Sequence, residues 1–265
     1  GFTTTALTPR IELLEDKSGA MELAAAQASK DFHAVPPEGL KIGFSKSAWW
    51  ARVTVENRDS TERDLVLRQV YPLMDYVTLW SPQDDGSWRA VHTGDRLDFG
   101  SREYQHRDFL FSLELPPGAK RTYYLRFASS GPIDIALEMY EPRTLLGTLG
   151  REQLAFGAYF GGFLVLVLYN FFIFLVVRDR AFFYYLLYAT SYGLYFSVYN
   201  GLSFQFLWPH NPSWGNTSLL VLLCSTLLFG LQFTRKFLEA RVNQPRMDKV
   251  AIALQVLSGI GLVAA

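Results

Sequence analysis

QLAFGAYFGGFLVLVLYNFFIFLVV, residues 153–177, contains no Asp, Glu, Lys or Arg. A helix that spans a bilayer needs about 20 mainly apolar residues. This stretch is therefore predicted to be a membrane span. A second window without these four residue types covers residues 181–234 and is long enough for two further spans.

The second window is interrupted by FQFLWPHNPSWGN, residues 204–216, which contains two prolines, two tryptophans and a histidine. Such a composition is typical of a loop at the membrane interface. We expect membrane helices near residues 153–177, 181–202, 214–237 and 250–265, with the sequence ending inside the fourth. Residues 146–265 are thus predicted to form an α-helical transmembrane bundle.

The loops between these helices differ in charge. Basic residues lie between the first and second helices and between the third and fourth, whereas residues 203–215 contain no Lys or Arg. The basic residues concerned are Arg178, Arg180, Arg235, Lys236, Arg241, Arg246 and Lys249. Because basic loops favour the cytoplasmic side, we predict that both basic loops lie inside the cell and that residues 1–145 lie outside the cytoplasm.

The charged residues are concentrated in the first part of the chain. Residues 1–150 hold 17 Lys or Arg and 21 Asp or Glu, against 8 and 4 in residues 151–265. The overall charge is zero, which gives no reason to expect nucleic acid as a partner. A single cysteine, Cys224, excludes a disulfide within the chain. The opening residues GFTTTALTPR lack the apolar segment of a signal peptide, so a signal was removed or the sequence starts after it.

The first part shows the period-two alternation of β-strands. In residues 48–57, Trp49, Ala51, Val53 and Val55 share one face of the predicted strand. Similar runs cover residues 76–81, 87–91, 108–115, 122–128 and 133–140, with turn sequences at PQDDG, 82–86, and LPPGAK, 115–120; only residues 21–32 favour a helix. Many short strands joined by Pro/Gly turns predict an all-β jelly-roll sandwich over residues 1–145.

Aromatic and basic side chains fall on the face opposite the predicted core. These are Trp50, Arg52, Tyr124 and Arg126. Each is compatible with an ordinary exposed residue, but together they are a candidate surface for stacking a sugar ring, because aromatic faces offer flat apolar area beside polar groups.

The polar stretch TGDRLDFGSREYQHRDFLF, residues 93–111, has three interpretations. In the structural one, Asp95 caps a turn while Arg102, His106 and Arg107 pair with nearby carboxylates. In the second, these four residues bind a ligand, since binding residues concentrate on loops of a rigid scaffold. In the third, two carboxylates hydrolyse a glycoside, although no nucleophile motif is present and we expect no catalytic residues.

Metal binding is weakly indicated. Asp84 and Asp85 precede Gly86 and offer oxygen ligands for calcium, but a plain hairpin turn explains them as well. The four histidines, His33, His92, His106 and His210, are scattered, which argues against zinc. We expect no cofactor.

Two patterns in the membrane half suggest how its helices pack. Gly157 and Gly161 form a small-xxx-small pair that permits close helix approach. Tyr185, Tyr188, Tyr192, Tyr195 and Tyr199 recur at spacings of three and four, which places them on one helical stripe. A packing seam explains the stripe, and a lining that rearranges on signalling is the alternative.

The order of these segments resembles the bacterial seven-transmembrane receptors with diverse intracellular signalling modules, in the form that carries the type-2 extracellular domain. The resemblance rests on GFSKSAWWARVTVEN, HTGDRLDFGSREYQHRDFLFSLELPPG and RTYYLRFASSG in the first half, and on GAYFGGFLVLVLYNFFIF, RDRAFFYYLLYA and FTRKFLEAR in the second. It implies a periplasmic jelly roll similar to carbohydrate-binding modules, seven helices, and a cytoplasmic output module such as a diguanylate cyclase or a histidine kinase.

The function expected from these observations is that of a sensor that binds a small ligand, with carbohydrate as the favoured class, and passes the signal through helices in the lipid. Two alternatives remain open: a membrane-anchored glycoside hydrolase, and a domain that contacts another receptor or a second copy of the chain without a small ligand. The junction EPRTLLGTLGRE, residues 141–152, is expected to carry the signal between the two halves.

Overall fold

The computed structural model describes residues 10–34 and 40–264. The expectation about the signal peptide falls on residues 1–9, outside this described part. The chain divides into two compact units. Unit 1 contains residues 1–148 and 204–212, and unit 2 contains residues 149–203 and 213–265. The loop 204–212 therefore belongs to the β-rich unit, although membrane helices flank it in the sequence.

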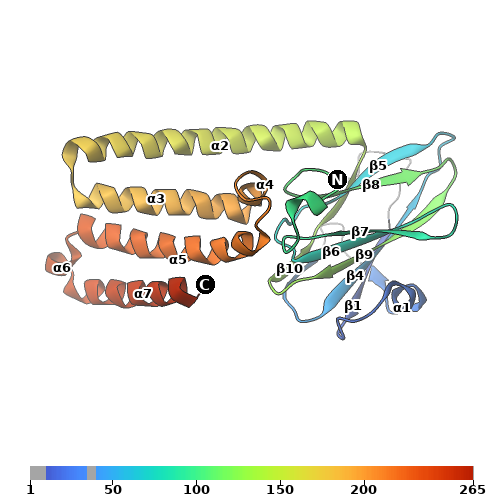
Figure 1. Cartoon of the computed structure of the whole chain (residues 1–265), viewed down its shortest axis with the longest axis horizontal. Coiled ribbons are helices and arrows are strands. Elements are labelled where there is room, and N and C mark those ends of the chain that lie inside the picture. Colours follow the sequence, from blue (N-terminus) through green and yellow to red (C-terminus); the bar gives the residue numbers. More distant parts are fainter. Residues whose placement is uncertain (1–9, 35–39, 265) are drawn as a thin grey trace. The chain divides into compact units, whose positions relative to one another are not determined.

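The largest sheet of unit 1 is antiparallel, with strand order β2-β1-β4-β9-β6-β7 (Figure 1). Its strands are β1 (Arg10–Asp16), β2 (His33–Ala34), β4 (Ala48–Glu56), β6 (Tyr76–Pro82), β7 (Trp88–Thr93) and β9 (Lys120–Ala128). Strands distant in sequence lie side by side in this sheet: β4 pairs with both β1 and β9, and β9 pairs with β6.

Two smaller sheets complete the sandwich. One pairs β10 (Pro132–Ile135) with β3 (Leu40–Phe44), and the other has the order β11-β5-β8, formed by Leu137–Tyr140, Arg63–Gln69 and Phe109–Leu115. One hydrophobic core joins all three sheets, and it contains Val53, Leu67, Phe111, Leu125 and Ile133. The alternating residues that the sequence assigns to the core face are buried there, except for the partly buried Trp49, and this confirms the antiparallel sandwich.

Local details also match or correct the sequence prediction. The PQDDG turn joins β6 to β7, with Gly86 at a φ of 82°. The predicted helix at residues 21–32 is shorter, α1 (Leu23–Ala28). The single strand predicted at residues 133–140 is instead two strands, because β10 pairs with β3 whereas β11 pairs with β5.

Unit 2 is helical. The long helices are α2 (Pro142–Val177), α3 (Arg180–Tyr199), α5 (Pro212–Phe237) and α7 (Pro245–Ala264), and the short ones are α4 (Leu202–Phe206) and α6 (Ala240–Asn243). Residues 142–148 of α2, residues 204–206 of α4 and Pro212 of α5 belong to unit 1. Glycines allow close approach between consecutive long helices: Gly193 in α3 faces Phe163 of α2, Gly230 in α5 faces Tyr188 of α3, and Gly261 in α7 faces Cys224 of α5.

Three helices are long and apolar enough to cross a membrane in the described part of the chain, namely α2, α5 and α7. The second predicted span is the helix α3, but α3 does not meet that criterion, because six tyrosines and several hydroxyl residues lower its hydropathy. The first predicted span starts earlier than expected: the junction 141–152 is not a separate connector, since α2 begins at Pro142 and continues to Val177.

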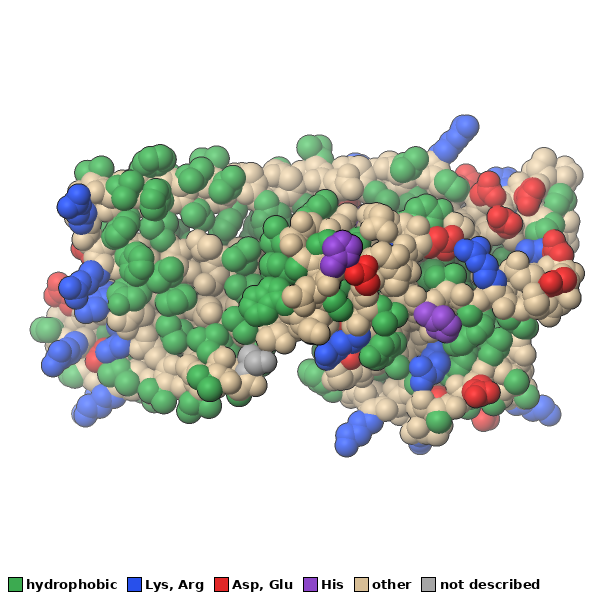
Figure 2. Space-filling model, in the orientation of Figure 1, with side chains coloured by type: hydrophobic (Ala, Val, Ile, Leu, Met, Phe, Trp, Pro, Cys, Tyr) green, Lys and Arg blue, Asp and Glu red, His purple; other side chains and the backbone are tan. Residues whose placement is uncertain are grey.

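The surface of unit 2 has the distribution expected in lipid (Figure 2). Hydrophobic side chains cover much of the visible helical surface, whereas Lys and Arg side chains gather at the end where α2 meets α3 and where α5 is followed by α6. These are the basic loops that the sequence assigns to the cytoplasm.

Candidate functional site

The outer face of the six-stranded sheet, the face directed away from the core, carries the aromatic residues that the sequence suggested for ligand binding. Alternation in β4, β6, β7 and β9 directs one set of side chains into the core and the other set to this outer face. The outer set is Trp50, Arg52, Thr78, Trp80, Trp88, Ala90, His92, Tyr124 and Arg126. Cross-strand pairing places Trp80 next to Tyr124 and Thr78 next to Arg126.

Half of the outer face is covered. The sequence predicts an open surface at Trp50 and Tyr124, but both side chains are buried, with exposed fractions of 0% and 7%. They form a second core with Leu14 and with Ala26 of α1, against which Phe32 also packs. The covering residues are 17–34. The alternation within β4 and β9 does not predict that another segment covers this face.

Asp16 fixes the start of this covering segment. One carboxylate oxygen accepts hydrogen bonds from the amides of Ser18 and Gly19 at 3.0 and 3.1 Å, and the other accepts one from the amide of Met21 at 2.9 Å. Burial acts to raise the pKa of Asp16, but these bonds and that of the Ser18 hydroxyl outweigh it, so the pKa is lowered.

The two arginines of the outer face have partners within the domain. Arg52 forms an ion pair with Glu12 at 2.6 Å, and its guanidinium lies 4.3 Å from the ring centre of Phe32. Arg126 donates a hydrogen bond to the carbonyl of Gly19 at 2.6 Å. Both side chains therefore hold the covering segment, and a role in ligand contact stays a prediction.

An aromatic group on β6 and β7 lies beside the covered half. Trp80 is stacked on Trp50 with ring centres 5.0 Å apart, and it meets His92 edge-on at 6.3 Å. Trp80 and Trp88 are partly exposed and His92 is exposed. The side chain of Thr78 bonds to His92 Nδ1 at 3.1 Å. We call Thr78, Trp80, Trp88 and His92 the aromatic platform.

Trp80, Trp88 and His92 were not among the predicted binding residues, although the sequence contains a signal for the two tryptophans. The alternation in residues 76–81 and 87–91 places Trp80 on one face of its strand and Trp88 on one face of the next. Applying the same face assignment to these strands as to residues 48–57 would have found both tryptophans.

The polar stretch 93–111 forms a buried cluster of charges. Asp95, Arg102, His106 and Arg107 are each less than a tenth exposed. The Arg102 guanidinium donates to the carbonyls of His106, at 2.8 Å, and Arg107. It also lies 4.5 Å from the ring centre of Phe99 and 4.3 Å from that of Phe109. Burial lowers the pKa of Arg102 to about 10, and the nearby charges of Asp95 and Asp108 oppose this shift.

Asp108 links the same cluster to strand β5. It is fully buried and forms an ion pair at 2.5 Å with Arg68, a residue of β5 that is 2% exposed. The amide of Asp108 donates to His106 Nδ1 at 3.1 Å. His106 and Arg107 lie 3.8 and 3.7 Å from Asp108, as the structural interpretation expects, whereas Arg102 donates to backbone carbonyls. Ligand binding by these residues stays a prediction.

The acidic turn between β6 and β7 is occupied by protein contacts. Asp84 pairs with Arg121, and Asp85 accepts a hydrogen bond from the amide of Ser87 at 2.9 Å. Among the described residues, no group of three or more His, Cys, Asp or Glu is placed to hold a metal ion.

Comparison with protein families accounts for both units. The model described as 7TMR-DISM extracellular 2 matches residues 8–141, and that described as 7TM diverse intracellular signalling matches residues 152–265. The chain belongs to the 7TMR-DISM receptor family. It is therefore a membrane protein with a non-catalytic extracellular sensor domain followed by transmembrane helices. Among curated proteins, none matches the chain.

The tyrosine stripe of the receptor's α3 contacts α5. Tyr185 meets Phe233 edge-on with ring centres 5.4 Å apart, and Tyr188 lies against Gly230. Within the stripe, Tyr188 stacks on Tyr192 and Tyr195 on Tyr199, at 6.3 and 6.2 Å. Tyr185 and Tyr188 therefore pack between α3 and α5, whereas Tyr192 and Tyr199 are 40% and 49% exposed. Rearrangement on signalling stays a prediction.

The predicted small-residue pair on α2 has no neighbour in this unit. A Cβ atom added at Gly157 or at Gly161 would meet nothing within 4 Å. Close helix approach at this pair therefore stays a prediction.

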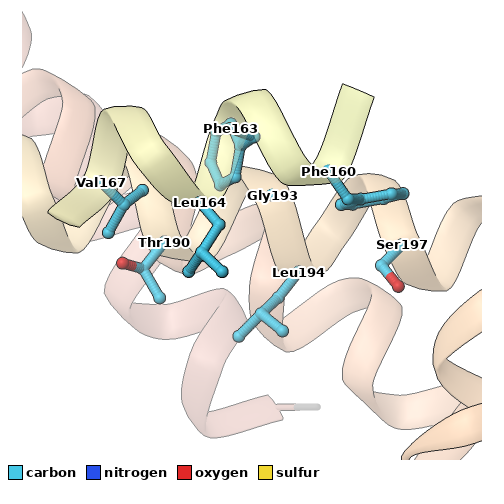
Figure 3. Close-up of a pocket in the computed structure, with 8 residues that line it drawn as sticks. All are labelled: Phe160, Phe163, Leu164, Val167, Thr190, Gly193, Leu194 and Ser197. Atoms are coloured by element: carbon cyan, nitrogen blue, oxygen red, sulfur yellow. The ribbon is translucent and has the colours of Figure 1, made fainter. Parts of the chain in front are cut away.

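An open, apolar pocket lies between α2 and α3 of the receptor (Figure 3). Its volume is about 270 Å³. Phe160, Phe163, Leu164 and Val167 of α2 and Leu194 of α3 line it, and the lining is completed by Thr190, Gly193 and Ser197. The size and lining suit an acyl chain rather than a charged molecule.

Proposed function

We propose that this chain is the ligand-sensing part of a bacterial inner-membrane receptor, and that the extracellular sandwich binds a carbohydrate on the aromatic platform. The observation that supports this is the pair of partly exposed tryptophans, Trp80 and Trp88, beside the exposed imidazole of His92. Indole faces supply the flat apolar area on which a sugar ring stacks, and the imidazole and the Thr78 hydroxyl offer hydrogen bonds to sugar hydroxyls.

The rigid support of the platform favours binding. Trp80 is backed by the fully buried Trp50, and Trp88 meets Tyr124 edge-on at 5.7 Å. Because these rings are held in place before a ligand arrives, little side-chain entropy is lost on binding. In this proposal Arg126 and Arg52 position the neighbouring cover, and the buried residues of the 93–111 stretch support the fold.

Because the chain belongs to a receptor family, ligand binding is expected to change a signalling output. A ligand changes the output only if it binds two arrangements of the receptor with unequal affinity. We propose that the helices pass this change to a cytoplasmic module of the diguanylate cyclase or histidine kinase type.

The experiment is a glycan screen followed by calorimetric titration, with the full chain in lipid nanodiscs. Replacing Trp80 with Ala should weaken the Kd of a bound glycan by about tenfold or more, which corresponds to about 1.4 kcal/mol. The matched control is Trp214→Ala, an exposed tryptophan of α5 in the other unit. Binding of no glycan by the wild-type chain, or equal Kd values for both variants, contradicts the proposal.

A further inference from the structure

Residues 204–212 pack against the 93–111 stretch inside unit 1, and we call this contact the clasp. Phe204 is 7% exposed and meets Phe99 edge-on with ring centres 5.3 Å apart. Arg102 lies 5.7 Å from the ring centre of Phe204, so the same cation contacts rings from both segments. The burial of Phe204 shows that this loop is packed into the domain and does not merely pass over it.

Polar contacts fix the position of the loop along its length. The amide of Phe99 donates to the carbonyl of Pro209 at 3.0 Å. The Gln205 side-chain amide donates to the carbonyl of Gln105 at 3.1 Å, and His210 Nδ1 lies 2.9 Å from Asp98 Oδ2. Together with the ring contact, these bonds hold Phe204 and Gln205 near the start of the segment and Pro209 and His210 near its end.

The clasp is connected to the aromatic platform through β7. His92 of the platform is followed in the chain by Thr93, whose hydroxyl bonds to the Ser101 hydroxyl at 3.1 Å. Ser101 ends the short 3-10 helix Phe99–Ser101, and Phe99 is the residue that contacts Phe204 and Pro209. The end of β7 is therefore linked to residues 204–212 by one hydroxyl pair and one turn of helix.

The chain itself carries the connection further. α5 begins at Pro212, the last residue of the clasped loop, and α4 (Leu202–Phe206), which follows α3, contains Phe204. Two membrane-domain helices are thus joined to the same anchored segment. The chain also passes from the sandwich to the helices at the start of α2.

We propose that the contact of residues 204–212 with Phe99 and Arg102 is a second signalling connection, which couples the end of β7 to α5. The direction of the signal rests on the sensor role proposed above. The coupling itself does not require a ligand, because thermodynamic coupling acts equally from either end. Its test therefore uses the ligand-free protein, and its failure leaves the carbohydrate proposal untouched.

The test is hydrogen–deuterium exchange of the full chain in lipid nanodiscs. Replacing Phe204 with Ala should speed exchange by about tenfold in residues 96–104, where the Phe99 amide loses its ordered acceptor, and also at the end of β7. The matched control is Phe206→Ala in the same short helix, because Phe206 is 68% exposed. A melting curve of each variant checks that the sandwich remains folded.

The second arm starts from the sandwich side. Thr93→Val removes the hydroxyl that bonds to Ser101 and should speed exchange in residues 204–212 and in the first turn of α5. Its control is Thr122→Val, which breaks the comparable hydroxyl pair with Thr54, 3.0 Å apart, elsewhere in the sheet. Exchange effects confined to the side of each mutation, with none across the clasp, would overturn the proposal; effects in both directions support it.

Discussion

Asp108 and Arg68 show how a single buried pair can hold a polar loop against a hydrophobic core. Their side chains are 0% and 2% exposed and form an ion pair at 2.5 Å. Burying two charges is costly, and the cost is offset only while both partners are present. The sequence predicts that the charged residues of this stretch pair with one another, but it does not identify Arg68, which comes 40 positions earlier.

Replacing Asp108 with Ala should lower the free energy of unfolding by about 3–5 kcal/mol, because the Arg68 charge is left buried without its main counter-charge. The double variant Arg68→Met/Asp108→Leu should recover most of this loss. Denaturation of the nanodisc-embedded chain, followed by tryptophan fluorescence, measures both. A double variant no more stable than Asp108→Ala would contradict the explanation.

Gly94 directly follows β7, at a point where the backbone passes very close to residue 75. A Cβ atom at position 94 would lie 1.9 Å from the Asp75 carbonyl oxygen. Gly94→Ala should therefore cost about 3 kcal/mol of stability, as an overpacked site that requires backbone movement. Gly131→Ala is the control, since its added Cβ would make an ordinary contact at 3.5 Å. Equal melting temperatures would refute the steric argument.

Asp16 gives a pH-dependent prediction. Its pKa is depressed in the folded chain, so its contribution to stability is present above the ordinary value of 3.8 and is lost as the pH falls through the lower folded value. Asp16→Asn should cost about 1–3 kcal/mol at pH 7, because hydrogen bonds to a charged group are lost. This difference from wild type should shrink in acid. A difference that is constant from about pH 7 to pH 2 would exclude the carboxylate as its source.

At the scale of elements, α2 is longer than its apolar stretch. The sequence locates the apolar part correctly, but it places the start of the helix near residue 153 and treats residues 141–152, which contain Gly147 and Gly150, as the junction to the last strand. In the structure both glycines lie within the helix. Helix propagation from the strongly helical span overrides their weak propensity.

The glycines in the first turns of α2 should therefore tune its stiffness. Gly147→Ala and Gly150→Ala place their methyl groups in open space, and each should stabilise the helix by about 0.8–1 kcal/mol. Slower hydrogen exchange over residues 142–152 is the expected result. Inserting several Gly and Ser residues there should have the opposite effect and uncouple the sandwich from the helices. Unchanged exchange in all these variants would show that residues 142–152 are not held as a helix.

At the scale of the whole molecule, the orientation across the membrane follows from the basic loops. In a Cys224→Ser background, a cysteine at position 84 in the sandwich should react with a membrane-impermeant maleimide in intact cells. Cysteines placed at Arg178 and at Lys236 should react only after permeabilisation. Because Lys and Arg are retained on the cytoplasmic side, labelling of these two positions from outside would reverse the assignment.

The sequence alone determined which faces of the strands enter the core and where the lipid-embedded helices lie, because alternation and long uncharged runs are local consequences of burial in a protein core or in lipid. It also established the family, through segments distributed over both halves. Only the tertiary structure showed that residues 17–34 cover Trp50, that Asp108 pairs with Arg68, and that residues 204–212 are anchored by Phe99. Each of these joins segments far apart in the chain, and the local pattern of one segment contains no information about which distant partner will bury it.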